Sequence, residues 1–384
     1  KTTLTFWHAM GGTNGEVLQQ IVDDFNASQD EIEIKAEYQG TYDDTITKLK
    51  AAMQSDSGLP DVCQMYDVGT KFMYDSGAVI PVEDKFESTG YDKSSVMDVI
   101  SSYYTVEGKQ YAMPFNVSTP MLYYNKDVFE AAGLDPETPP TTYDEVLEDA
   151  KKIVESGAAP VGYSQAIYGW FFEQQLAGLG VTYGNNDNGR TEAVTAVDFD
   201  SNGGGLKVFD MWKKLYDSGY FEDYGTTTAD TQTAFFSGQV GMIIESTAIL
   251  KNAVDSSPFE VGTGYLPRIE QNDEGGVIIG GGSLWLTDTG NEANEDAAWK
   301  FIEYITRPEN ATIVFSARDL LAPTIKGVQA ADIPIRDALD NEIIPDAMQF
   351  LDWTWPAEVN DAFMQAIPAT LAGQMTCEQA AQSI

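Results

Sequence analysis

The sequence is poor in the residues that most catalytic and metal sites require. Its 384 residues include one histidine and two cysteines, and only 22 lysines and arginines stand against 60 aspartates and glutamates. A single histidine excludes most metal sites and most histidine-based acid–base chemistry. The two cysteines, Cys63 and Cys377, lie too far apart for a disulfide framework or a zinc site. We therefore expect no metal and no cofactor, and favour two unpaired thiols.

The shortage of positive charge limits the partners as well. A formal net charge of −38 repels phosphate backbones and anionic membrane surfaces, so the sequence predicts no nucleic-acid partner. No apolar run reaches the roughly 20 residues that span a bilayer. The opening residues, KTTLTFWHAM, are no signal peptide and are typical of a chain trimmed after export, or of a cytosolic chain without its methionine.

What the sequence does contain is ample material for a core. Hydrophobic residues make up 43% and aromatic residues 11% of the chain, whose length predicts two lobes or one large one. Strands are expected at 4–8, 32–36 and 61–66, with helices at 16–26 and 42–55 between them. This order favours a parallel sheet, in which ligands gather at the carboxyl ends of strands. The loops after His8, Gly40 and Tyr66 are therefore the first candidates for a ligand-binding site.

Later segments continue this α/β pattern. Amphipathic helices are predicted at 143–156, 205–218 and 293–306, and the apolar run VIIGGGSLWL predicts another strand. Four of the tryptophans fall in periodic apolar runs, which predicts that they lie in the core: Trp7, Trp212, Trp285 and Trp299.

Seven segments together resemble extracellular solute-binding proteins (family 1) of ATP-binding-cassette (ABC) importers, in particular glycerol-3-phosphate binders and their carbohydrate-binding relatives. They are FWHAM, YQGTYDD, MYDVGT, PFNVSTPMLYYNKDVF, AFFSGQVGMI, IIGGGSLWL and FIEYITRPENA. The likeness runs from about residue 4 to residue 325 and fades toward the C-terminus. These motifs indicate the class and say little about the ligand.

The resemblance implies an α/β periplasmic-binding-protein (Venus-flytrap) fold with two lobes, each a mainly parallel sheet with helices on both faces. We expect an N-terminal lobe of residues 1–113 plus 264–317 and a C-terminal lobe of residues 114–263 plus 318–384. The ligand would lie in the cleft between them and be captured by hinge closure. A monomeric receptor would then present it to the transmembrane subunits of the importer. The expected location is the periplasm or the outer side of the cytoplasmic membrane, with a lipid anchor.

The resemblance also implies a set of ligand-binding residues. Most are neutral or acidic hydrogen-bonding groups suited to hydroxyls, and some are aromatic faces. His8 joins them because it ends the first strand, although it could equally cap the following loop. The set carried over from the motifs is Tyr42, Asp67, Asn116, Ser118, Trp170, Ser246, Gly281, Gly282, Asp352, Trp353 and Trp355.

Three departures from the glycerol-3-phosphate binders bear on specificity. Ile167 stands where a second tryptophan is usual, and RDLLAPT lacks the usual tyrosine. Asp352 stands where those proteins carry a phosphate-gripping arginine, and residues 337–384 contain no arginine or lysine. Losing a charge-assisted hydrogen bond costs roughly 1.5–3 kcal/mol, and a facing carboxylate adds repulsion. Glycerol-3-phosphate is therefore a poor candidate ligand.

The remaining chemistry favours a neutral carbohydrate, an oligosaccharide of two or more units. A sugar ring presents one face of C–H groups to indoles and an edge of hydroxyls to acidic acceptors. A quaternary ammonium head, as in glycerophosphocholine, stays open as an alternative because it binds aromatic rings through cation–π contacts. An alternative of another class is a carbohydrate hydrolase that uses two of the acids. We favour the non-enzymatic receptor.

Overall fold

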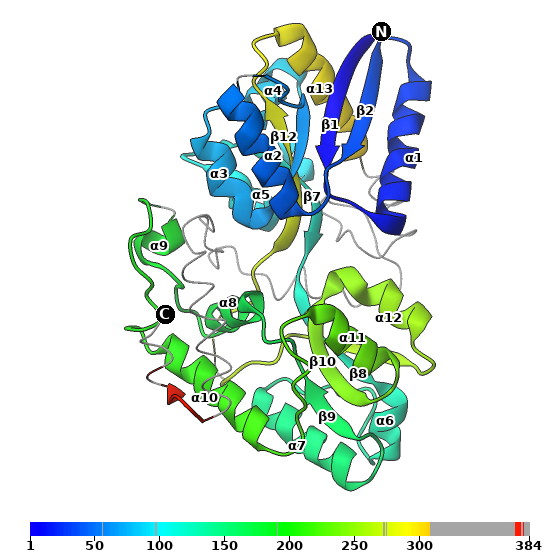
Figure 1. Cartoon of the computed structure of the whole chain (residues 1–384), viewed down its shortest axis with the longest axis vertical. Coiled ribbons are helices and arrows are strands. Elements are labelled where there is room, and N and C mark those ends of the chain that lie inside the picture. Colours follow the sequence, from blue (N-terminus) through cyan, green and yellow to red (C-terminus); the bar gives the residue numbers. More distant parts are fainter. Residues whose placement is uncertain are drawn as a thin grey trace. The chain divides into compact units, whose positions relative to one another are not determined.

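The structure is a computed structural model that describes residues 1–307 except 56, 97, 190, 272 and 274, together with 373–377 and 379. Within these residues, no helix combines the length and apolarity needed to cross a membrane. The chain divides into two compact units (Figure 1). Unit 1 contains Lys1–Ser118 and resumes at Ile279, and unit 2 contains Thr119–Ile278.

Unit 1 is built on a mixed sheet in the strand order β2-β1-β3-β12-β4, with β7 also paired to β12. Strand β1 runs parallel to β2 and β3, whereas β12 runs antiparallel to β3, β4 and β7. As a result, Gly282 near the start of β12 pairs with Tyr66 at the end of β3. The bounds are β1 Thr2–His8, β2 Ile32–Tyr38, β3 Val62–Tyr66, β4 Val79–Ile80, β7 Ala112–Ser118 and β12 Gly280–Thr287.

The core of unit 1 lies where α1 and α13 cover this sheet. Apolar side chains of α1 recur at helical spacing and pack with the inward residues of β1 and β2 and with α13. A small hairpin pairs β5 (Thr105–Val106) with β6 (Lys109–Gln110). The helices of the unit are α1 Gly12–Ser28, α2 Tyr42–Ser55, α3 Thr70–Asp75, α4 Val82–Thr89, α5 Asp98–Ser101 and α13 Glu292–Ile305.

Unit 2 has a four-stranded sheet in the order β11-β8-β10-β9. Strands β9 and β10 are parallel, and β8 runs antiparallel to both β10 and β11. Helix α7 begins with a capping box in which Thr142 and Glu145 satisfy each other's backbone N–H groups. The strands are β8 Pro120–Asn125, β9 Val161–Ser164, β10 Val240–Ser246 and β11 Val261–Gly264. The helices are α6 Lys126–Ala131, α7 Tyr143–Glu155, α8 Gly169–Gly178, α9 Asn185–Gly189, α10 Gly204–Asp217, α11 Thr228–Phe236 and α12 Leu250–Ser256.

The α/β class is confirmed, but both sheets are mixed rather than mainly parallel. The division between units also differs from the expected one: it falls at 118/119 and 278/279, later than the expected 113/114 and 263/264. Strand β7 stays with unit 1 because it pairs with β12. The segment before Ile279 stays with unit 2, since Gln174 of α8 exchanges two hydrogen bonds with the Ile278 backbone (2.8 and 2.9 Å).

Three of the four expected core tryptophans are buried: Trp212, Trp285 and Trp299. Trp7 is only half-buried. Strand alternation turns Phe6 and His8 inward and places Trp7 on the opposite face, where its indole N–H donates to Glu37 at 3.0 Å. The expectation of a core role for Trp7 was wrong.

Replacing Trp299 should destabilise unit 1 strongly. Its ring is fully buried against Phe86 and Tyr91, with centroids 5.5 and 5.4 Å away. We expect Trp299→Ala to lower the free energy of unfolding by about 3–5 kcal/mol, measured by denaturant titration with circular dichroism. Trp7→Ala serves as the control and should cost clearly less. Equal losses for the two variants would contradict this packing.

Candidate functional site

A hydrogen-bond network at the carboxyl ends of the unit 1 strands joins three elements. Gln64 of β3 accepts from the Ala9 backbone N–H (2.9 Å), and its amide nitrogen donates to Asn116 Oδ1 (2.9 Å). Asn116 of β7 in turn donates through Nδ2 to the hydroxyl oxygen of Tyr42 (2.8 Å), which opens α2. Gln64 is fully buried and Asn116 is half-buried. The network thus fixes the orientation of two partly exposed side chains, those of Asn116 and Tyr42.

The glycines of β12 make room for this network. A Cβ on Gly282 would lie 2.5 Å from Asn116 Oδ1 and 3.0 Å from the Tyr42 hydroxyl. Gly281 has a φ of +93° and its Cβ would lie 1.8 Å from the Asn116 carbonyl oxygen, so a side chain is excluded by conformation and by space. Both residues therefore line the predicted site by lacking side chains. Ser118 ends β7, buried and paired in register with Gly280.

Tyr42 carries an aromatic partner that the sequence did not reveal. Its ring stacks on Tyr66 with centroids 5.1 Å apart and planes 11° from parallel, so one of its two faces is covered. The Tyr66 hydroxyl donates to Asp43 at 3.2 Å. Burial raises the pKa of Tyr42 to about 12, the hydrogen bond from Asn116 opposes the rise, and the charge of Asp67 adds to it. Tyr42 is thus a neutral hydroxyl at physiological pH.

Asp67 lies directly after β3, in the turn Asp67–Gly69, and is 7% exposed. Its backbone carbonyl accepts from the Thr70 hydroxyl (2.6 Å) and from the Tyr103 hydroxyl (3.0 Å), which hold the turn in place. The cluster formed by Tyr42, Gln64, Tyr66, Asp67 and Asn116, called here the unit 1 cluster, therefore offers hydroxyl, amide and carboxylate groups.

His8 ends β1 and is buried among aromatic rings. Its Nδ1 accepts from the Met10 backbone N–H at 3.3 Å, and its ring lies 5.6 Å from Phe6 and 5.8 Å from Tyr38. Burial lowers the pKa of His8 to about 4, because a charged imidazole is poorly solvated there. The side chain is therefore neutral at physiological pH.

In unit 2, Ser246 ends β10 and caps the following turn. Its side chain accepts from the Ala248 backbone N–H (3.1 Å), and its carbonyl accepts from the Tyr123 hydroxyl (2.7 Å). The preceding Glu245 is buried and accepts from Gln232 Nε2 (2.9 Å) and from the Ser246 backbone N–H (2.7 Å). Burial raises the pKa of Glu245. Ser246 is thus rigidly held while remaining half-exposed.

Trp170 lies in the first turn of α8 and is half-buried. Its ring is 5.7 Å from Phe171 and 6.5 Å from Tyr168, the residue just before the helix. Tyr168 is 44% exposed, whereas Ile167 is buried. An exposed aromatic ring beside Trp170 is therefore supplied by Tyr168, one position after Ile167, where the resemblance implies a second tryptophan.

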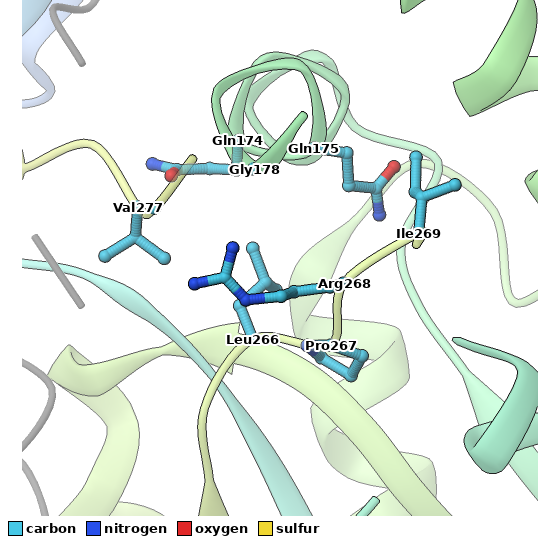
Figure 2. A pocket seen from close by; sticks show the side chains of 9 residues that line it. Gln174, Gln175, Gly178, Leu266, Pro267, Arg268, Ile269 and Val277 are labelled. Atoms are coloured by element: carbon cyan, nitrogen blue, oxygen red, sulfur yellow. The ribbon is translucent and has the colours of Figure 1, made fainter. Parts of the chain in front are cut away.

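A pocket in unit 2 lies between α8 and the segment that follows β11. It is small and partly open to solvent, with a volume of about 10 Å³, which holds about one water molecule. Figure 2 shows the Arg268 side chain extending between Leu266 and Val277 under Gln174. Arg268 Nη1 donates to the carbonyl oxygens of Asp273 (2.6 Å) and Gly275 (2.7 Å). This guanidinium therefore helps to fold its own loop.

Three predicted residues, Asp352, Trp353 and Trp355, lie outside the described residues. Within the described part, no group of three or more His, Cys, Asp or Glu side chains is arranged to hold a metal ion. The sequence analysis did not predict Gln64, Tyr66 or Tyr168 as site residues. Gln64 and Tyr66 belong to the third predicted strand and Tyr168 directly precedes a helix, so their position near the ends of elements is the signal that could have found them.

Comparison with known proteins identifies the family. The profile described as bacterial extracellular solute-binding protein matches residues 20–342. This chain belongs to the bacterial extracellular solute-binding proteins. It is 37% identical over 293 residues to the sn-glycerol-3-phosphate-binding periplasmic protein UgpB of Brucella abortus, an alignment that covers 74% of this chain and 66% of that relative. The chain thus spans slightly less than two thirds of this relative's length.

Solved structures confirm the two-lobe fold of this solute-binding protein. A cyclic alpha-maltosyl-1,6-maltose binding protein from Arthrobacter globiformis matches with a TM-score of 0.78 and 25% identity, over 100% of this chain and 96% of that one. UgpB from Mycobacterium tuberculosis, solved with glycerophosphocholine, matches with a TM-score of 0.81 and 20% identity over the same shares. The Brucella relative and the Arthrobacter protein are both named as binding proteins, which favours the non-enzymatic prediction over the hydrolase. The extracellular family and its periplasmic relatives also support the predicted location outside the cytoplasm.

The protonation of His8 is directly testable because this solute-binding protein has one histidine. We expect its imidazole NMR signals to titrate with a midpoint near pH 4. The folded state then binds fewer protons than the unfolded state between pH 4 and 6.5, so stability falls as pH drops through that range. His8→Gln should remove up to about 3 kcal/mol of this pH dependence in unfolding experiments. A midpoint near 6.5 would show that the ring is solvated.

Proposed function

We propose that this solute-binding protein captures a neutral oligosaccharide outside the cytoplasm and delivers it to the transmembrane subunits of an ABC importer. The observation that carries the proposal is the chemistry of the unit 1 cluster. A neutral tyrosine hydroxyl, an oriented amide and a carboxylate lie together at the carboxyl ends of the strands of the sheet. Such groups hydrogen-bond sugar hydroxyls, whereas none of them neutralises a phosphate.

The aromatic groups of unit 2 support the same ligand. Trp170 and Tyr168 combine a half-buried indole with an exposed phenol at the start of α8. Flat rings of this kind cover the C–H face of a pyranose, and oriented hydroxyls satisfy its edge. In this proposal, Ser246 contributes a further hydroxyl from the end of β10, and Asp352, Trp353 and Trp355 contribute from the C-terminal segment.

The proposal includes the mechanism of capture. A monomeric receptor, periplasmic or lipid-anchored, closes its lobes on the ligand, and binding shifts that equilibrium only by the difference in affinity between the open and closed forms. The loaded form is the one that the importer subunits recognise. The residues for which we propose ligand contacts in unit 1 are His8, Tyr42, Asp67, Asn116, Ser118, Gly281 and Gly282.

A glycerophosphodiester such as glycerophosphocholine is the second candidate ligand. Two observations favour it: the similarity to UgpB proteins, and a guanidinium, that of Arg268, in a pocket of unit 2. Two backbone carbonyls already share its Nη1, so an anion would have to use the other nitrogens. Arg268→Gln separates the candidates: it should abolish binding of a phosphodiester and leave binding of a neutral sugar within about twofold.

Isothermal titration calorimetry tests the proposed ligand class. We expect a neutral oligosaccharide from a panel of plant and gut glycans to bind with micromolar or tighter affinity. Glycerol-3-phosphate should bind at least about a thousandfold more weakly, as expected from losing several kcal/mol. Bound sugar should be recovered intact, with no new reducing end. Micromolar binding of glycerol-3-phosphate, with no sugar bound, would overturn the proposal.

Trp170 should contribute a stacking surface to that binding. We expect Trp170→Ala to weaken sugar binding at least about tenfold, since aromatic stacking contributes on the order of 1 kcal/mol or more. Trp7→Ala is the matched control, because Trp7 is also half-buried but its indole is engaged by Glu37. An unchanged affinity of the Trp170 variant, measured by calorimetry, would show that α8 does not contact the ligand.

A further inference from the structure

Tyr38 is an exposed aromatic residue at the end of β2. Along this strand, Ile32 and Ile34 turn into the core at every second position, and Tyr38 continues the same alternation. The hydrophobic core does not extend to the end of the strand, so Tyr38 is 58% exposed. This is the highest exposed fraction among the large hydrophobic residues of the described chain. A single exposed ring is common on protein surfaces, so only what lies beside Tyr38 can indicate a ligand.

The ring is nevertheless held in position. Its centroid lies 5.8 Å from that of His8, and the two residues are partners in the β1–β2 register. Gly11 lies against its other end, where an added Cβ would come within 2.9 Å of the Tyr38 hydroxyl. A ring that is fixed before binding loses little conformational entropy when a ligand covers it.

The unit 1 cluster lies at the same end of the sheet as Tyr38, the end formed by the carboxyl ends of β1, β2 and β3. The β1–β3 register pairs Phe6 with Val62, which places His8 beside Gln64. The hydrogen bonds from Gln64 to Asn116 and from Asn116 to Tyr42 then lead to Gly282 on β12. Tyr38 therefore lies at one end of a row that passes the unit 1 cluster and ends at Gly282 on β12.

The distance across these strands, from Tyr38 on β2 to Gly282 on β12, indicates the size of the ligand. In the strand order β2-β1-β3-β12, three steps of about 4.8 Å separate the outer strand from β12, or about 14 Å. This length is comparable to three linked pyranose rings. The loop after β1, the strand between β2 and β3, leads through Gly11 into α1 at Gly12, where a Cβ would meet no atom within 4 Å. No side chain of these two glycines stands in the way of an extended ligand.

We propose that Tyr38 forms an outer sugar subsite, and that the ligand is an oligosaccharide of at least three residues. The unit 1 cluster binds the inner sugars, and the phenol ring of Tyr38 stacks on the outer one. A glycerophosphodiester or a disaccharide is too short to reach both ends. This inference rests on the proposed function, because it names the size of the same ligand.

Calorimetry with di-, tri- and tetrasaccharides of the malto-, cello- and xylo-series tests this subsite. We expect the trisaccharide of the preferred series to bind about tenfold more tightly than the disaccharide. Tyr38→Ala should remove this gain and leave disaccharide affinity within about twofold. Tyr38→Phe should keep it, because the ring is retained. Gly11→Ala should reduce the gain by displacing the hydroxyl, and combining it with Tyr38→Phe should restore it.

The outcomes separate this inference from the function on which it rests. Binding of a sugar with the same affinity for two and three residues, or with no length-dependent effect of Tyr38→Ala, overturns the outer subsite alone. Binding of no sugar in any series overturns both. Circular dichroism and thermal unfolding of Tyr38→Ala verify folding, and a misfolded variant is replaced by Tyr38→Leu, which keeps apolar volume without the ring.

Discussion

The hydrogen bonds from Gln64 to Asn116 and from Asn116 to Tyr42 are the interactions on which the candidate site depends. They join β3, β7 and the start of α2, and they are possible only because Gly282 leaves the space that a side chain would fill. Each group satisfies its neighbour, so none is buried without a partner, and the order of donors is fixed. The side chains of Asn116 and Tyr42, both partly exposed, are therefore held in a single arrangement.

The two units contain different kinds of groups. Unit 1 contains oriented hydrogen-bonding groups and the neutral His8, whereas unit 2 contains the aromatic pair of α8 and the hydroxyl of Ser246. Apolar rings combined with uncharged or acidic polar groups suit a carbohydrate, which has both an apolar face and a hydroxyl edge. The relatives bind both sugars and glycerol phosphates by name, so family membership alone does not choose between them. The residues do.

Local patterns in the sequence predicted the elements well and their pairing less well. The helix at 42–55 is found with those bounds, and the first strand and helix differ only at their ends, because apolar spacing reports directly on which face is buried. The direction of β12 could not be predicted, since it depends on a chain return across more than a hundred residues. Gln64 looked like an ordinary polar residue in a strand; only the pairing of β3, β7 and β12 reveals its role. Trp7 and Tyr38 show the same limit, because strand alternation gives the face of a residue but not where the core ends.

The central claim is that the carboxylate of Asp67 accepts hydrogen bonds from an uncharged ligand. The most direct test is calorimetry of Asp67→Asn with the ligand that the unmodified protein binds best. Hydrogen bonds to a charged acceptor contribute roughly 1.5–3 kcal/mol, so the account predicts at least about a tenfold loss of affinity. Tighter binding by the variant would contradict the account, because removing a carboxylate helps only a ligand that carries negative charge itself.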